Sequence, residues 1–326
     1  MKARWAIGLT LATCVVAASN AYGFEEIRLS TTTDSSRGEL AVSGSVVVWT
    51  DSRGLCGYDF RTGQEFVTSS RSCGTLSVSG NTVVWSENGD IYGYDLATHT
   101  EFPISTSAAG QVHPAISGNV VVWVDGRSDP GDIYGYDLST HTAFPICTHA
   151  GHQNHPRISG RIIVWQDDRN NKMDIYGYDL ASQSEFPICT RPGNQQFPGV
   201  SGDFVVWNEQ NVDVYGYDLA AQTEFAICTD PAGQSGLNIG DNVVVWRDDR
   251  GNGDIYGYDL SKRITFPICL NAAEQTAPAA SANIAAWADS RNGSRDIYGA
   301  VIPEPATLAL LALGGLAVMR RRKRNT

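Results

Sequence analysis

The chain has 326 residues, of which 42% are hydrophobic and 18% charged, with 33 Gly, 13 Tyr, 10 Phe, 8 Trp and only 3 Met. This composition disfavours a helical bundle and favours an all-β fold, which at this length is often a single unit. The formal charge is −11, yet seven of the 24 Lys and Arg stand in the first four and last seven residues. The body between the ends is therefore strongly acidic, which argues against nucleic-acid binding.

The first 23 residues have the layout of a secretory signal peptide. A short basic region precedes an apolar run over residues 6–18, and small residues follow it. Cleavage signatures end at Ala21 and at Gly23, so a signal peptidase would start the mature chain at Tyr22 or Phe24. We expect the signal peptide to span residues 1–23, with its apolar part forming a short targeting helix.

Seven copies of one unit fill residues 24–301. The unit is plain in residues 114–123 (PAISGNVVVW), 132–138 (DIYGYDL) and 144–148 (FPICT). One Trp marks each copy, and the spacing from one Trp to the next is 36 to 42 residues: Trp49, Trp85, Trp123, Trp165, Trp207, Trp246 and Trp287. A period near 40 with several short strands in each copy predicts the blades of a β-propeller.

Each copy predicts four antiparallel strands. A short first strand precedes an unbroken apolar run, residues 120–124, which suits a strand covered on both faces. The third strand alternates around Gly135, and we expect this glycine to let a neighbouring aromatic ring approach. The fourth contains Pro145, and Pro103, Pro187 and Pro267 recur at the same place, so this strand should form the outer edge of each blade.

The two ends of the repeat array complement each other. The last copy lacks a fourth strand, whereas residues 26–31 (EIRLST), ahead of the first copy, align with the fourth strand at residues 185–190 (EFPICT). We therefore predict that the N-terminal strand completes the seventh blade and closes the ring, which leaves no open sheet edge.

The DIYGYDL strands resemble those of the TolB-like propeller family, over roughly residues 25 to 301. The resemblance implies the propeller fold. It implies little about function, because propellers host both binding modules and enzymes.

Six cysteines remain after removal of the signal peptide, an even number in an exported chain. Four of them occupy the same place in four successive outer strands: Cys147, Cys189, Cys228 and Cys269. Blades are too far apart there for a disulfide, so we expect four unpaired, buried thiols. Cys56 and Cys73 lie outside the repeat pattern and could pair.

Histidines supply the first candidate site. His149, His152 and His155 share one loop, and His113 and His155 take equivalent places before a proline at the start of the first strand. They could form a ligand or metal site at the opening of the ring, since metals favour such groupings and some propeller polysaccharide lyases use a His-ligated metal. The alternative is that they are solvated loop residues.

The turns that follow each Trp supply the second candidate. Residues 248–253 (DDRGNG) superficially resemble a calcium loop, but Arg250 stands where an oxygen ligand should be. The alternative is a turn in which the Asp side chains accept backbone amides and the Arg pairs with a neighbouring acid. A third recurrent carboxylate, which ends each DIYGYDL strand, also predicts a structural turn, since catalysis needs one asymmetric pair: Asp95, Asp137, Asp179, Asp218 and Asp259.

The C-terminal segment, residues 302–326, reads Pro303-Glu304-Pro305, then 14 mostly apolar residues (306–319), then an Arg/Lys cluster. This order resembles the PEP-CTERM sorting signal of Gram-negative bacteria. The resemblance implies a short transmembrane helix at 306–319, transient association with the inner membrane, processing by an exosortase, and delivery to the cell surface or extracellular matrix.

Two functional hypotheses follow. The first is a non-catalytic surface propeller that binds protein or polysaccharide, or builds the matrix, and needs no cofactor. The alternative is a secreted metal-dependent polysaccharide lyase or hydrolase. The chain contains no nucleophile elbow, phosphate loop or HExxH motif.

The C-terminal signal generates the first testable prediction. A 14-residue helix covers only ~21 Å of a ~30 Å hydrocarbon core, so the tail suits processing better than permanent anchoring. Fractionation of the native host, followed by mass measurement of the C-terminal peptide, should show that the mature protein has lost residues 320–326. Recovery of an intact, membrane-bound C-terminus would contradict processing.

Overall fold

The computed structural model describes residues 24–34, 36–69, 73–127, 130–210, 212–281 and 283–302. The expected signal peptide (1–23), the sorting motif Pro303, Glu304 and Pro305, and the helix expected at 306–319 lie outside the described residues. The described part is all-β, and it holds no helix long and apolar enough to cross a membrane.

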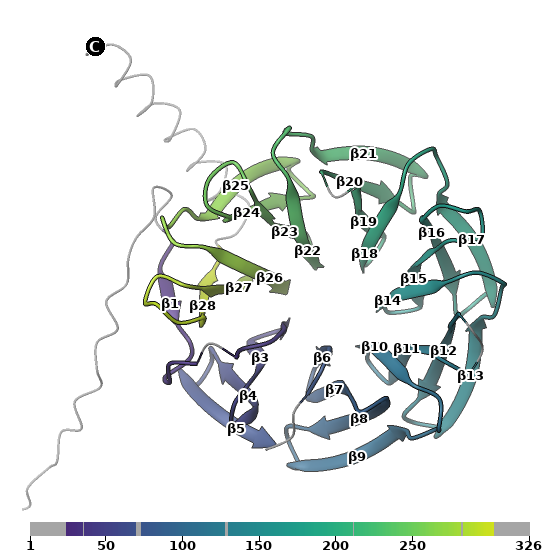
Figure 1. The fold of residues 1–326 in the computed structure, drawn as a ribbon, viewed down its shortest axis with the longest axis horizontal. Helices are drawn as coiled ribbons and strands as arrows, with labels where there is room; N and C mark the ends of the chain where they lie inside the picture. Colours follow the sequence, from purple (N-terminus) through teal and green to yellow (C-terminus); the bar gives the residue numbers. More distant parts are fainter. Residues whose placement is uncertain are drawn as a thin grey trace, which may run out of the picture.

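Twenty-eight strands form seven four-stranded antiparallel sheets around a central axis (Figure 1). Blade 1 holds β2 (Leu40–Ser43), β3 (Val46–Asp51), β4 (Gly54–Asp59) and β5 (Gln64–Ser69). Blade 2 holds β6 (Leu76–Ser79), β7 (Thr82–Glu87), β8 (Asp90–Asp95) and β9 (Thr100–Ser105). Blade 3 holds β10 (Gln111–Ser117), β11 (Val120–Asp125), β12 (Asp132–Asp137) and β13 (Thr142–Cys147). Blade 4 holds β14 (Gln153–Ser159), β15 (Ile162–Asp167), β16 (Asp174–Asp179) and β17 (Ser184–Cys189).

Blade 5 holds β18 (Gln195–Ser201), β19 (Phe204–Glu209), β20 (Asp213–Asp218) and β21 (Thr223–Cys228). Blade 6 holds β22 (Gln234–Gly240), β23 (Val243–Asp248), β24 (Asp254–Asp259) and β25 (Ile264–Cys269). Blade 7 holds β26 (Gln275–Ser281), β27 (Ile284–Asp289), β28 (Asp296–Val301) and the N-terminal β1 (Glu26–Arg28). First strands such as β14 and β22 lie nearest the axis, and fourth strands such as β9 and β13 form the rim (Figure 1).

The N-terminal strand closes the ring, as the sequence predicts. Glu26 lies opposite Ala300 and Arg28 opposite Tyr298, which is the register of fourth strands elsewhere in the ring. The closing strand also repeats an ion pair of other blades, because Arg291 contacts Glu26 at 2.6 Å just as Arg53 contacts Glu65. The fourth strand of blade 7 is therefore equivalent in detail to those made by the continuous chain.

The core lies between blades rather than inside them. All seven repeat Trp side chains are at most 1% exposed. Each apolar cluster joins two neighbouring blades; one of them combines Val122 and Ile133 of blade 3 with Ile163 and Trp165 of blade 4. Gly135 admits an aromatic ring, as expected, because a Cβ there would lie 2.7 Å from the ring of Phe144.

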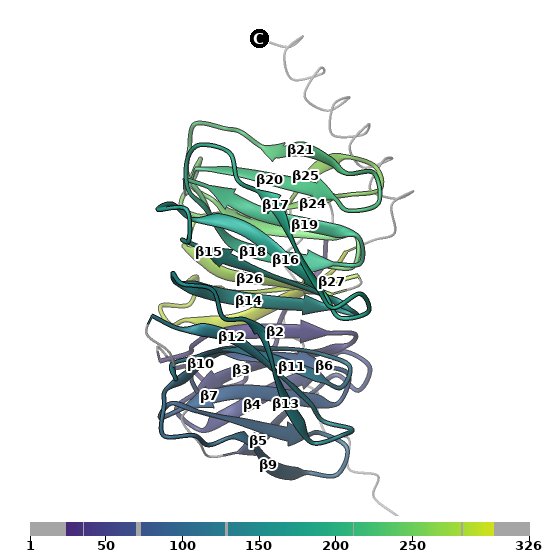
Figure 2. The same cartoon turned by 90° about the vertical axis from the view of Figure 1, so that its right-hand side faces the viewer.

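The strands run between two faces of the disk (Figure 2). We call the face with the turns between second and third strands the loop face, and the face with the turns between first and second strands the turn face. Both described ends of the chain lie at the turn face, where Phe24 and Ile302 join one apolar cluster and the Ile302 amide bonds Asn283 O.

Serine hydroxyls at the turn face link successive blades. In five places the Ser that ends a first strand accepts the Gly amide of the next blade at 2.9 to 3.1 Å: Ser281 to Gly44, Ser43 to Gly80, Ser79 to Gly118, Ser117 to Gly160 and Ser159 to Gly202. Blade 6 has Gly240 instead of Ser. A Cβ at Gly240 would lie 2.0 Å from the backbone oxygen of Ala280, so blades 6 and 7 approach each other too closely for any side chain.

This close approach predicts that Gly240→Ala weakens the ring. Overpacking against backbone should lower the free energy of unfolding by about 1–3 kcal/mol, measured by urea denaturation. Gly110→Ala is the matched control, since nothing lies within 4 Å of a Cβ there, and it should stay within about 0.5 kcal/mol of the parent. Equal stability of the two variants would contradict the close blade contact.

Candidate functional site

A β-bulge sets the side chains at the loop-face end of the tunnel. The first strands of blades 3 to 7 each shift register by an extra residue beside the axis. The bulged residues have φ between 48° and 62°: His113, His155, Phe197, Gly236 and Ala277. Bulges re-aim side chains, and four of these five residues line one cavity.

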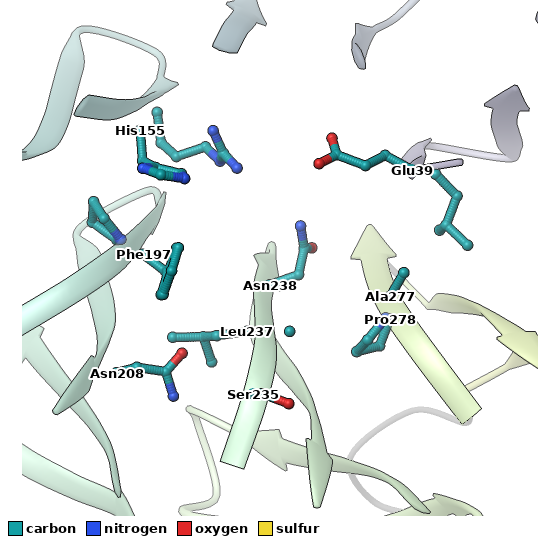
Figure 3. A pocket seen from close by; sticks show the side chains of 13 residues that line it. Glu39, His155, Phe197, Asn208, Ser235, Leu237, Asn238, Ala277 and Pro278 are labelled. Atoms are coloured by element: carbon teal, nitrogen blue, oxygen red, sulfur yellow. The ribbon is translucent and has the colours of Figure 1, made fainter. Parts of the chain in front are cut away.

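This cavity, the tunnel mouth, has a volume of about 380 Å³ and is lined by residues of blades 1, 4, 5, 6 and 7 (Figure 3). Its size falls within the range of small-ligand sites. Its lining includes Glu39, His155, Arg157, Phe197 and Asn238.

An aromatic cluster forms one wall of the tunnel mouth. The rings of His113 and His155 stack with centroids 4.4 Å apart, and Phe197 meets His155 edge-on at 4.9 Å. Phe197 is 42% exposed, which is unusual for a large apolar side chain in this protein. The exposed Phe197 ring, with His155 nearly at right angles to it, therefore offers an apolar surface to whatever enters.

The hydrogen bonds of Asn154 fix the tautomer of His113. Asn154 Oδ1 accepts the backbone N–H of His155 at 2.8 Å, and His113 Nδ1 lies 2.8 Å from the same oxygen. His113 Nδ1 must therefore carry a proton, which leaves Nε2 of the neutral ring as an acceptor.

His155 is held neutral. Burial, followed by the nearby His113 and Arg157, lowers the pKa of His155 to about 3. Its Nδ1 atom is buried and has no hydrogen-bond partner. His155 can therefore contribute hydrogen bonds and ring contacts to the site, but no positive charge.

Arg157 differs in size and charge from the residues at the same position of the other six blades. The equivalent residues, each opposite the third residue of a second strand, are otherwise small or carry an amide: Ala41, Ser77, Ala115, Gly199, Asn238 and Ala279. Arg157 Nη1 donates to Pro156 O at 3.0 Å. No carboxylate of the described residues lies within ion-pair distance of it. Burial lowers the pKa of Arg157, and the negative charge of Glu39 across the tunnel opposes this effect.

Asn238 presents a fixed donor. Its Oδ1 accepts the Ala280 amide of the next blade at 3.1 Å, which is the link that Ser77 makes to Ile116 in blade 2. The Nδ2 group is thereby turned toward the tunnel mouth (Figure 3).

The structure brings together only two of the four predicted His. His113 and His155 stack in the tunnel, whereas His149 lies 4.0 Å from Glu185 Oε1 and the His152 amide donates to Asp168 Oδ1. Across the described ranges, no three His, Cys, Asp or Glu side chains gather as a metal site would require. Sequence reasoning missed Arg157, Phe197, Glu39 and Asn238, although an alignment of the seven first strands would have exposed Arg157.

The Asp/Arg turns are built into the scaffold. In blade 4, Trp165 Nε1 donates to Asp167 Oδ2 at 2.9 Å, and Arg169 pairs with both Asp167 and Glu185 while stacking 4.1 Å above Tyr176. In blade 6, Arg250 occupies both carboxylate oxygens of Asp248 at 2.7 and 2.8 Å. The carboxylates at the ends of third strands accept amides two residues later, which confirms their role in turns: Asp95, Asp137, Asp179, Asp218 and Asp259.

The cysteines of the outer strands are free thiols. Burial raises the pKa of Cys147 to about 12 and that of Cys189 to about 11, so neither is a reactive thiolate at neutral pH. Cys56 is also a buried thiol, 3.2 Å from Asp51 Oδ1, and it forms no disulfide with Cys73.

Comparison with known proteins bears on sorting and on fold. The PEP-CTERM protein-sorting motif matches residues 301–324. The chain carries a PEP-CTERM sorting signal. This signal implies processing by an exosortase and sorting of an exported protein to the cell surface. No curated protein matches the chain significantly.

Solved structures share the propeller fold at low identity. TolB from Acinetobacter baumannii is 18% identical, with 77% of this chain and 68% of TolB covered and a TM-score of 0.54. An oligogalacturonate lyase in complex with manganese is 13% identical, with 86% and 98% covered and a TM-score of 0.62. The oligogalacturonate lyase from Vibrio parahaemolyticus is 12% identical, with 86% and 97% covered and a TM-score of 0.63. These likenesses establish the β-propeller fold.

The turn in blade 4 predicts a substitution whose effect on the free energy of unfolding depends on pH. Hydrogen bonds from Arg169 and Trp165 outweigh burial and lower the pKa of Asp167, so its stabilising contribution is full above the unfolded pKa of about 3.9 and is lost as pH falls through the lower folded pKa. Asp167→Asn should cost about 2 kcal/mol at pH 7 and progressively less below about pH 4. Urea denaturation across pH measures this, with the exposed Asp203→Asn as control; a loss that stays constant down to pH 2 would contradict the assignment.

Proposed function

We propose that this protein is an exosortase-sorted surface propeller that binds a polysaccharide or protein at the tunnel mouth without catalysing a reaction. The proposed layout is a signal peptide at 1–23, the propeller at 24–301 and the sorting signal at 302–326. Signal peptidase and an exosortase act on the two ends, and association with the inner membrane is transient. The final location is the cell surface or the extracellular matrix.

One observation carries the binding role: the tunnel mouth departs from the seven-fold pattern in several chemical respects at once. Its lining includes an exposed aromatic ring, one ring of a stacked His pair and an unpaired cation, whereas the rest of the ring repeats closely. A scaffold needs no such asymmetry. Binding sites do, because a ligand presents different groups on different sides.

The alternative of a metal-dependent polysaccharide lyase would need converging ligands. The His113–His155 pair finds no third His, Cys, Asp or Glu beside it in the described part of the chain. An oligogalacturonate lyase with this fold forms a complex with manganese, but that complex is not evidence of metal binding by this chain. We therefore propose binding, and the test below also detects cleavage.

Binding at the tunnel mouth should depend on Phe197. The purified protein, incubated with the host's extracellular polysaccharide and with its surface proteins, should retain one of them, and Phe197→Ala should weaken retention about tenfold. Val212→Ala removes a similarly exposed apolar side chain outside the cavity and should change nothing. Equal retention by both variants would place binding elsewhere, and manganese-dependent shortening of the polysaccharide would establish the lyase instead.

A further inference from the structure

The tunnel mouth contains a positive charge that the protein leaves unneutralised. The chain is acidic overall, at −11, and most described arginines pair with a carboxylate, as Arg53, Arg169, Arg250 and Arg291 do. Arg157 has none in the described residues, and its one protein hydrogen bond uses one of five donors. None of its nitrogens is a buried atom without a partner, so its free donors remain open to a group that enters the cavity.

Glu39 limits the negative charge that a ligand of Arg157 can carry. Its side chain lines the same cavity as Arg157 from blade 1 (Figure 3), and its negative charge partly offsets the lowering of the Arg157 pKa by burial, although the two residues form no ion pair. A group with one negative charge can pair with Arg157 and tolerate Glu39. A phosphate dianion would meet stronger repulsion.

The remaining lining suits a ring that carries many hydroxyls. Phe197 offers an exposed ring face to C–H groups, with the His155 ring beside it, and Asn238 Nδ2 donates from a fixed position. The Glu39 carboxylate is an acceptor for hydroxyl protons. An unbranched acyl chain would leave these polar groups unused, and their desolvation would then oppose binding.

We propose, as a deepening of the function proposed above, that the tunnel mouth binds a carboxylated sugar unit of an acidic polysaccharide. The carboxylate pairs with the Arg157 guanidinium, in the two-pronged geometry that Arg favours. The sugar ring lies against Phe197 and His155, and its hydroxyls bond Asn238 and Glu39. The cavity of about 380 Å³ accommodates an end unit rather than a long stretch of chain.

The test is isothermal titration of the purified protein with glucuronate and galacturonate disaccharides. Their methyl esters, the neutral parent disaccharides, sugar phosphates and a short peptide with a free C-terminal carboxylate serve as comparison ligands. The acidic disaccharides should bind, and esterification should weaken binding about tenfold or more, because it removes the charge that Arg157 contacts.

Two variants isolate the cation. Arg157→Gln should weaken binding of the acidic disaccharides about tenfold. Arg161→Gln removes the same charge four residues away, where the side chain is 64% exposed and pairs with Asp179, and it should bind as the parent does. Arg157→Gln should also melt no lower than the parent, since it removes an unpaired charge; a lower melting temperature with unchanged binding would mean a structural role and overturn the proposal.

Glu39→Gln supplies an independent check. Loss of the opposing charge should strengthen binding of the acidic disaccharides about twofold to fivefold and admit sugar phosphates. Equal binding of neutral and acidic disaccharides would overturn the carboxylate assignment, and Arg157-dependent binding of the peptide alone would overturn the sugar assignment. Retention of a polymer through Phe197 with no disaccharide binding would refute this inference while leaving the proposed function standing.

Discussion

The apolar faces of each blade are covered only by its neighbours. Trp165 lies in a cluster with Val122 and Ile133 of the preceding blade, and the same arrangement recurs around the axis. An isolated four-stranded blade would leave such surfaces in water, so stability comes from completing the circle. This dependence explains why the closing strand reproduces the register and the Arg–Glu ion pair of the other fourth strands.

The repetitive part of the fold could be predicted because every copy carries the same local signals. The seven Trp, the Pro in the outer strands and the alignment of residues 26–31 with 185–190 gave the number of blades and the position of closure. The carboxylates that end the third strands recur from blade to blade, and this repetition assigned them to turns rather than to catalysis. These inferences use patterns that each blade satisfies by itself, so they required no knowledge of which residues meet across the ring.

The tunnel mouth could be predicted only in part. His113 and His155 were placed together through their equivalent positions, whereas His149 and His152 were grouped with them through proximity in sequence. Residues that are close in sequence within one loop can lie far apart in the ring, because the loop runs between the rim and the axis. Arg157 stands out only when the seven first strands are aligned with one another, because the β-bulge changes which residues of the first strand face the axis.

Closure by β1 and β28 also sets the order of events during export. In an export that starts from the N-terminus, the strand that completes blade 7 would cross the membrane before the rest of the propeller, and its partner would cross last. A chain that emerges N-terminus first can pair neighbouring blades in turn, but its first strand must wait for the final one. Ring completion would then coincide with arrival of the sorting signal, whose match begins at Val301, the last residue of β28. The fold links the end of translocation to the start of sorting, so an exosortase that acts after ring completion would receive folded cargo.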